Sequence, residues 1–226
     1  LENVYKGLGE MQAIASNVGD LKKVLSNVKT KGIMGEIQLG AILDEILAPE
    51  QYAEQIPVTP KSSERVDFAV KLPASENGDG VLLPIDSKLP LESYHKIKEA
   101  MDNGNPELIK EGRSELRLAI RKYAKDVSTK YIDVPNTTDF AIMFLPFEGL
   151  YSEVVNRGMV EILQREYKVN IAGPSTMAAL LNSLQMGFKT LAVQKRSAEV
   201  WKILGSVKTE FDKFNDVLVA TQQRLN

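Results

Sequence analysis

The feature of this sequence that most constrains its fold is a pair of short apolar segments joined by a polar turn. Residues 65–72 read RVDFAVKL, residues 81–88 read VLLPIDSK, and the connection between them contains SENGDG. Apolar residues alternate with others in both segments, and glycine-bearing turns of this kind connect antiparallel strands. The sequence therefore predicts a β-hairpin, and the fold must contain a sheet.

Each strand of this hairpin carries an aspartate where a core residue would be expected. Alternation places Asp67 on one face of the first strand, and it places Asp86 and Lys88 together on one face of the second. A turn centred near residues 77–78 sets Asp67 across from residues 86–88. Two carboxylates and an ammonium group are therefore expected to converge.

Carboxylates at such short range repel each other. Either the pKa of one carboxyl group is raised or a bound cation offsets the repulsion. Mg²⁺ or Mn²⁺ would serve as this cation, because hard cations bind carboxylate oxygens. A metal held there could polarise a phosphodiester, and Lys88 could orient the attacking water or stabilise developing charge. The alternative interpretation is that Asp67, Asp86 and Lys88 are solvated residues on an exposed face of the sheet.

The rest of the chain alternates between helical and strand patterns. Residues 139–146, DFAIMFLP, are almost continuously apolar, which is typical of a central strand buried on both faces. Further strands are expected at YAEQIPV and KVNIAG, and helical spacing is found around residues 32–47, 106–130 and 150–166. We therefore expect an α/β fold with a mixed central sheet.

Both ends of the chain read as long helices with heptad spacing. Apolar residues in alternating 4-3 steps occupy Val4, Leu8, Met11, Ala15 and Val18, and later Val200, Leu204, Val207, Phe211, Phe214, Leu218, Thr221 and Leu225. Such helices pack against each other or against another chain, which would give a homo-oligomer. The expected organisation is a helical arm at 1–31, an α/β core at 32–184 and a second helical arm at 185–226.

A basic stripe lies on the helix expected around residues 106–130. It consists of Arg113, Arg117, Arg121 and Lys125, which recur every four residues. Such a stripe could follow the phosphate backbone of DNA. The alternative is a solvated helix face whose charge is offset by nearby acids, namely Glu111, Glu115 and Asp126.

Composition excludes several classes of site. The chain of 226 residues has no cysteine, which excludes disulfides and thiolate zinc sites. It has a single histidine, His95, so a Ser-His-Asp triad is not favoured. The net charge of −2 predicts no overall attraction to polyanions. No apolar run approaches the ~18 residues of a membrane span, and the chain starts inside a helical pattern. We expect a reducing, cytoplasmic setting for a fragment whose upstream anchor, if any, is not in view.

Several segments, taken in order, resemble the RmuC family of bacterial DNA recombination proteins. They are GIMGEIQLGAILDEIL, EQIPV, RVDFAVKLP, LPIDSKLPLESY, DFAIMFLPFEGLYSEV and NIAGPSTMAALLNSL. The resemblance implies a restriction-endonuclease-like core of the PD-(D/E)xK type, flanked by coiled coil. It further implies a role in limiting recombination between inverted repeats as a nuclease. In full-length members an N-terminal membrane helix is common, which would place the protein at the inner face of the bacterial membrane.

The resemblance also assigns the site residues. Glu36 becomes the helix acid, Asp67 the first strand acid, and Asp86 with Lys88 the Asp-x-Lys pair; the three acids would hold Mg²⁺ or Mn²⁺. Two positions depart from the family pattern, since Val66 replaces the usual proline and Met34 the usual tryptophan. Neither change removes a ligand.

Two further residues have two interpretations each. Gln55 could polarise a group of the site, or it could pair with backbone at a strand edge. Glu148 follows the central strand and is read as a helix N-terminal acid in preference to a support for the site. For the whole chain, the alternative to a metal-dependent deoxyribonuclease is a non-catalytic coiled-coil scaffold that binds DNA or protein partners.

Overall fold

The computed structural model describes residues 28–59, 63–73 and 80–225 of the chain. The heptad expected from Val4 to Val18 and most of the hairpin turn lie outside the described residues. Contacts divide the chain into a first unit that ends at Leu181 and a second unit, Asn182–Asn226. The first unit contains the sheet and the candidate site, and the second consists of the continuation of the last helix.

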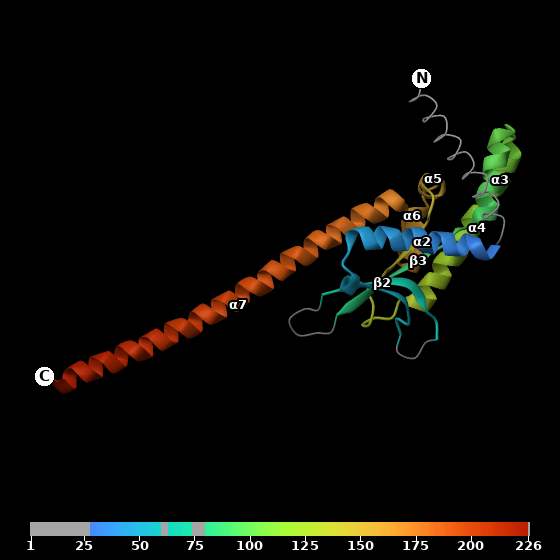
Figure 1. Cartoon of the computed structure of the whole chain (residues 1–226). Helices are drawn as coiled ribbons and strands as arrows, with labels where there is room; N and C mark the ends of the chain where they lie inside the picture. Colours follow the sequence, from blue (N-terminus) through green and yellow to red (C-terminus); the bar gives the residue numbers. More distant parts are fainter. Residues whose placement is uncertain (1–27, 60–62, 74–79, 226) are drawn as a thin grey trace, which may run out of the picture. The chain divides into compact units, whose positions relative to one another are not determined.

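Helices and strands are interspersed along the chain, with three consecutive strands after the first helices (Figure 1). The strands are β1 (Tyr52–Ile56), β2 (Val66–Leu72), β3 (Val81–Ser87), β4 (Ala141–Phe144) and β5 (Val169–Ala172). The helices are α2 (Val28–Ile46), η1 (Pro49–Gln51), α3 (Leu91–Asp102), α4 (Pro106–Tyr131), α5 (Glu148–Val155), α6 (Met159–Tyr167) and α7 (Pro174–Leu225).

The five strands form one mixed sheet in the order β1-β2-β3-β4-β5. β1, β2 and β3 are antiparallel to one another, whereas β4 is parallel to both β3 and β5. The α/β class and the mixed sheet are thereby confirmed. The hairpin register pairs Phe68 with Ile85, so the next facing pair in the same register is Asp67 and Asp86.

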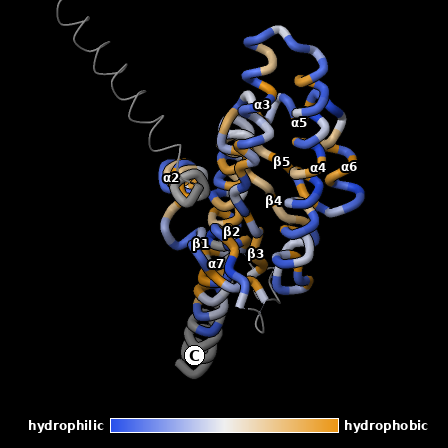
Figure 2. Tube along the Cα trace, turned by 90° about the vertical axis from the view of Figure 1, so that its right-hand side faces the viewer, coloured by the Kyte–Doolittle hydropathy of each residue, from blue (hydrophilic) through white to orange (hydrophobic). Residues whose placement is uncertain are grey.

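Helices cover both faces of the sheet, as the continuous apolar pattern of the central strand requires (Figure 2). α4 packs its buried residues Ile120 and Ala124 in one core with Ala69 and Met143. α2 covers the opposite face, where a Cβ built on Gly40 would lie 3.2 Å from the Phe68 ring. β4 is buried along its whole length between these layers.

Two helical regions differ from the sequence-based expectation. Residues 91–102 form α3, which no pattern had indicated, and it packs so closely on α4 that a Cβ on Gly112 would lie 3.0 Å from Ile97 Cγ1. The helix expected around residues 150–166 is divided into α5 and α6, because Gly158 takes a left-handed conformation with φ 64°. In the described part of the chain, no helix is both long and apolar enough to cross a membrane.

Candidate functional site

Asp67 of the hairpin opens onto a cleft at the end of β3. This cleft has a volume of about 490 Å³ and is lined by Glu36 from α2, Asp67 from β2, and Ser87 and Lys88 from the end of β3. The first turn of α3 and two residues of α4, Ala119 and Tyr123, complete its walls.

Asp67 is held by hydrogen bonds to both carboxylate oxygens. The backbone N–H of Ser87 donates to Oδ2 at 2.8 Å, and Gln55 Nε2 donates to Oδ1 at 3.4 Å. Gln55 itself has a left-handed backbone with φ 48°, and Arg65 Nη1 donates to its carbonyl oxygen at 2.6 Å. A non-glycine residue in this conformation is strained, and such strain is often found beside functional groups. The structure therefore places the Gln55 side chain against the site acid, within the edge strand β1.

Asp86 lies behind Lys88 and is 1% exposed. The Lys88 ammonium group pairs with Asp86 Oδ2, and Lys88 keeps 28% of its side-chain surface exposed to the cleft. Burial raises the pKa of Asp86 to about 6, and the charge of Asp67 contributes to the rise, while Lys88 and Tyr131 act in the opposite direction. The carboxylate is thus costly to ionise and is stabilised by one partly accessible cation.

Glu36 reaches the same cleft because α2 approaches β3 closely. Gly35, next to Glu36, faces the Ser87 hydroxyl, and a Cβ added at Gly35 would lie 3.4 Å from Pro146 Cγ and 3.7 Å from Ser87 Cβ, so helix and strand are in close contact here. Partial burial raises the pKa of Glu36, the Asp67 charge raises it further, and Lys88 lowers it. Glu36, Asp67, Asp86 and Lys88 therefore form one electrostatically coupled group.

The carboxylates of this cleft are the candidate ligands for a divalent cation. Among the described residues, no three His, Cys, Asp or Glu side chains are placed to hold a metal ion together. Glu36 and Asp67 do line one cleft, and their mutual repulsion is of the kind that a cation relieves. Because Mg²⁺ commonly binds one or two carboxylates and keeps several waters, the residues fit a two-carboxylate site, with Asp86 buried behind it. The arrangement does not form a three-carboxylate cage.

The basic stripe lies on a different flank of α4 from the cleft. Arg113 bonds to Glu153 of α5 with two contacts of 3.2 Å, and Arg121 pairs with Glu166 of α6 at 2.5 Å. These acids replace the expected partners on α4; of those, Glu115 instead pairs with Lys96 at 2.8 Å. The ion pairs of Arg113 and Arg121 are thus made with acids of other helices and not with those of α4.

Two cations of the stripe have no carboxylate partner among the described residues. Arg117 and Lys125 are exposed, and neither has an ion pair with any residue that the structure describes. The stripe therefore offers two unpaired cations and two that already have carboxylate partners.

Two tyrosines of α4 lie at the site, and Glu148 lies at the start of α5. Tyr131 ends α4 near Asp86, and Tyr123 lines the cleft; only the spacing of tyrosines on the apolar face of α4 could have indicated them. Glu148 is in the first turn of α5, and its Oε1 accepts from the Ser175 N–H at the start of α7 at 2.6 Å. The helix-terminal interpretation of Glu148 agrees with this position.

The fold and the cleft define an α/β protein with a buried Asp-x-Lys pair beside two further carboxylates. The model of the RmuC family matches residues 1–226, and the chain belongs to this family. A DNA recombination protein RmuC homolog of Xylella fastidiosa (strain Temecula1 / ATCC 700964) is 52% identical over 228 residues, which cover 100% of this chain and 50% of that protein. A homolog of the same description from Neisseria meningitidis serogroup B (strain ATCC BAA-335 / MC58) is 27% identical over 236 residues, covering 92% of this chain and 38% of that protein.

The chain thus spans about half the length of the Xylella fastidiosa relatives it matches. No solved structure matches it.

Proposed function

We propose that this chain acts in DNA recombination and that its cleft cleaves DNA phosphodiester bonds in a reaction dependent on Mg²⁺ or Mn²⁺. The observation that carries the proposal is the coupled group of Glu36, Asp67, Asp86 and Lys88 at one cleft. Perturbed acids beside a specific cation in a cleft are a mark of functional sites. The description of the relatives as DNA recombination proteins supports DNA as the substrate, and we propose that the chain acts on it in the bacterial cytoplasm.

Glu36 and Asp67 are the residues that would hold the ion, and Asp86 would add its charge from behind them. The ion, when bound, supplies a water of lowered pKa and an electrophile for the phosphate oxygen. The protein's own side chains and backbone orient the ligands of the ion and stabilise charge on the phosphate. The Ser87 N–H and Gln55 fix the Asp67 carboxylate in one orientation.

Lys88 is the residue with the clearest role in the cleavage step. Its ammonium group is partly exposed to the cleft while it remains tied to Asp86. A cation positioned by a buried carboxylate can stabilise the charge that develops on the phosphate oxygens. Lys88 thereby serves the reaction, and DNA attraction depends on Arg117 and Lys125 of α4.

The test is a cleavage assay with Mn²⁺ on linear, hairpin and single-stranded DNA. Lys88→Ala should abolish cleavage and leave DNA affinity nearly unchanged, while the matched control Lys122→Ala, an exposed lysine of α4, should cut at the wild-type rate. Calorimetry of Mn²⁺ binding to wild type and Asp67→Asn gives a second readout that does not need turnover. Cleavage by Lys88→Ala at the wild-type rate would show that the nuclease proposal is wrong.

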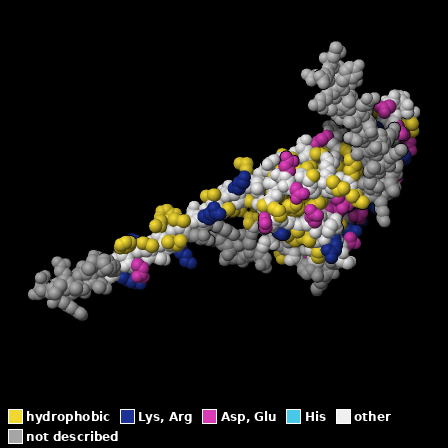
Figure 3. Space-filling model, viewed as in Figure 1, with side chains coloured by type: hydrophobic (Ala, Val, Ile, Leu, Met, Phe, Trp, Pro, Cys, Tyr) yellow, Lys and Arg dark blue, Asp and Glu magenta, His cyan; other side chains and the backbone are white. Residues whose placement is uncertain are grey.

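One observation favours the second candidate, a coiled-coil scaffold. Apolar residues recur in α7 at seven-residue intervals at Met186, Val193 and Val200, and these three and Phe211 are 70%, 63%, 55% and 69% exposed. Figure 3 shows hydrophobic side chains at several places along the surface of this helix. An apolar seam of this kind is expected to pair with another helix, and a second copy of the chain would supply one. The two candidates are distinguished by the cleavage assay, because a scaffold cuts no DNA either with Lys88 or without it, whereas the nuclease loses its cleavage in Lys88→Ala.

A further inference from the structure

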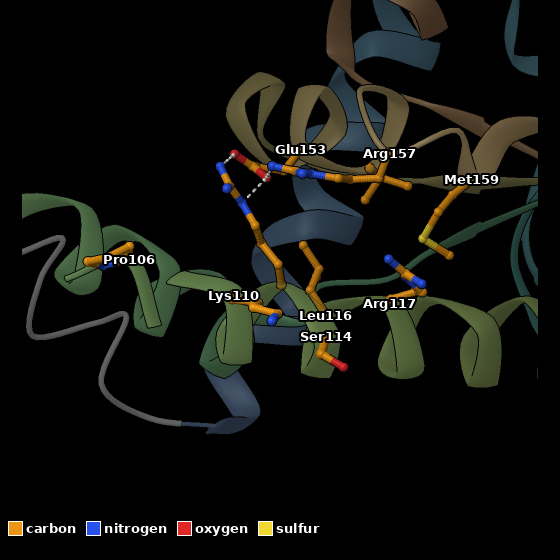
Figure 4. A pocket seen from close by; sticks show the side chains of 10 residues that line it. Pro106, Lys110, Ser114, Leu116, Arg117, Glu153, Arg157 and Met159 are labelled. Carbon is orange, nitrogen blue, oxygen red and sulfur yellow. Dashed lines mark hydrogen bonds and ion pairs between the residues drawn. The ribbon is translucent and has the colours of Figure 1, made fainter. Parts of the chain in front are cut away.

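A second cleft, separate from the candidate catalytic cleft, lies between α4 and the α5–α6 region (Figure 4). Its volume is about 300 Å³, at the lower end of the range for small-molecule sites. Four cationic side chains line it against a single carboxylate, that of Glu153; the cations are Lys110, Arg113, Arg117 and Arg157. Such an excess of positive charge in a concave site favours an anionic ligand.

Glu153 organises two of these cations. Its carboxylate receives two hydrogen bonds from Arg113, each of 3.2 Å, and lies 3.8 Å from Arg157 Nη2. The Glu153 side chain is only 18% exposed, so the two guanidinium groups are held by a largely buried anchor. A guanidinium fixed in this way has already lost much of its conformational entropy, and less is lost when a ligand binds.

The other two cations are unpaired. Lys110 and Arg117 are exposed and have no ion pair with any described residue, and they lie two turns apart on one side of α4. The base of the cleft is apolar, since Leu116, Val154 and Met159 are at most 3% exposed. The cleft therefore combines fixed guanidinium groups, free cations and an apolar base, which suits an anion attached to an organic group.

We propose that this cleft binds a phosphomonoester, supplied either by the 5′-phosphorylated end of a DNA strand or by a free nucleotide. A phosphomonoester carries about −1.5 to −2 charge at neutral pH and three acceptor oxygens, more than the single charge of a backbone phosphodiester. The negative charge of the phosphomonoester would be offset by the unpaired Lys110 and Arg117 and by the two arginines that share the Glu153 carboxylate. Arginine forks bind two phosphate oxygens at once, which gives the site its specificity.

The proposal is independent of cleavage, because none of its residues lines the catalytic cleft. Calorimetry with the whole chain should show that deoxyadenosine 5′-monophosphate binds and that deoxyadenosine binds at least about tenfold more weakly, as expected when charged hydrogen bonds are absent. Inorganic phosphate should compete with the monophosphate. Equal affinity for nucleoside and nucleotide would overturn the proposal.

A matched pair of variants tests the residues. Arg117→Ala and Lys122→Ala each remove one exposed cation from α4, but only Arg117 lines the cleft. Arg117→Ala should weaken nucleotide binding by about tenfold, whereas Lys122→Ala should change it by less than about twofold. If both variants lose affinity equally, the effect is one of net charge and the site is wrongly assigned.

Two further ligands identify the source of the phosphate. A 5′-phosphorylated oligonucleotide that binds more tightly than both its 5′-hydroxyl counterpart and the mononucleotide indicates a DNA end. A mononucleotide that binds more tightly than the phosphorylated oligonucleotide indicates a free nucleotide. Lys88→Ala should leave both affinities unchanged, so failure of the nuclease proposal and failure of this one are separately visible.

Discussion

Replacing Asp86 by asparagine should make the α/β unit more stable at neutral pH. Asp86 is 1% exposed, and burial raises its pKa from the ordinary 3.8 to about 6. A carboxyl group whose pKa is higher in the folded state binds its proton more tightly there, so its ionisation favours unfolding. The contribution of Asp86 to the free energy of unfolding is greatest when the carboxyl group is protonated. This contribution decreases as the pH rises from about 4 to about 6, and it does not recover at higher pH.

The magnitude follows from the shift. A change of about two pKa units corresponds to about 3 kcal/mol of lost stability above pH 6. Asparagine has nearly the same shape and no charge, so Asp86→Asn should recover up to about 3 kcal/mol at pH 7.5 and almost none at pH 3.5. The Lys88 contact is already included in this shift, and Lys88 can extend into the cleft once its partner is neutral.

Urea titrations between pH 3.5 and 8 measure the effect. Near-ultraviolet circular dichroism of the tyrosines follows the α/β unit, since the single tryptophan, Trp201, lies in α7. Glu99→Gln, an exposed acid on α3, is the control with the same change of charge and should show no such pH dependence. The reasoning is refuted if Asp86→Asn is less stable than wild type by the same amount at pH 4 and pH 7.5.

Three other outcomes are expected. Gly112→Ala should destabilise the α/β unit by about 1–3 kcal/mol in the same titration, because the added Cβ meets the packed α3, while Gly187→Ala, with nothing within 4 Å, should not. Lys125→Ala should lower the slope of log DNA affinity against log salt by up to ~0.9, and Arg121→Ala by less, because its charge is already partnered. Phe211→Glu should abolish self-association in analytical ultracentrifugation and leave thermal unfolding of the α/β unit unchanged; a persistent oligomer would exclude the α7 seam as its contact.

The sequence predicted the hairpin and its facing acids because the information is local. The length of the connection and the two-residue alternation are sufficient to place Asp67 opposite residues 86–88, and the observed register selects Asp86 from that stretch. The central strand β4 was equally predictable, because a short and unbroken apolar run is typical of a strand that is buried on both faces of a sheet. The burial of Asp86 was not predictable, since it depends on α4 closing over that face of the sheet.

The misjudged regions depend on contacts between segments distant in sequence. α3 has only a few buried residues, among them Ile97, and its packing against α4 is what supports it. Gly158 was present as a signal for the break between α5 and α6 but was outweighed by the surrounding helical spacing. The partners of the basic stripe, Glu153 and Glu166, lie 40 and 45 residues from Arg113 and Arg121, beyond the reach of helical periodicity.

The three acids of the proposed catalytic cleft differ in access, and this difference orders their roles. Glu36 and Asp67 line the cleft and are half-buried, whereas Asp86 is 1% exposed and pairs with Lys88, which does line the cleft. In the proposed site, a cation held by Glu36 and Asp67 would therefore compete with Lys88 for the charge of Asp86. A weaker Lys88–Asp86 pair would leave the Lys88 ammonium group free to face the cleft, where the scissile phosphate of the proposed reaction would lie. The charge of Asp86 and the position of Lys88 are thus linked through one ion pair.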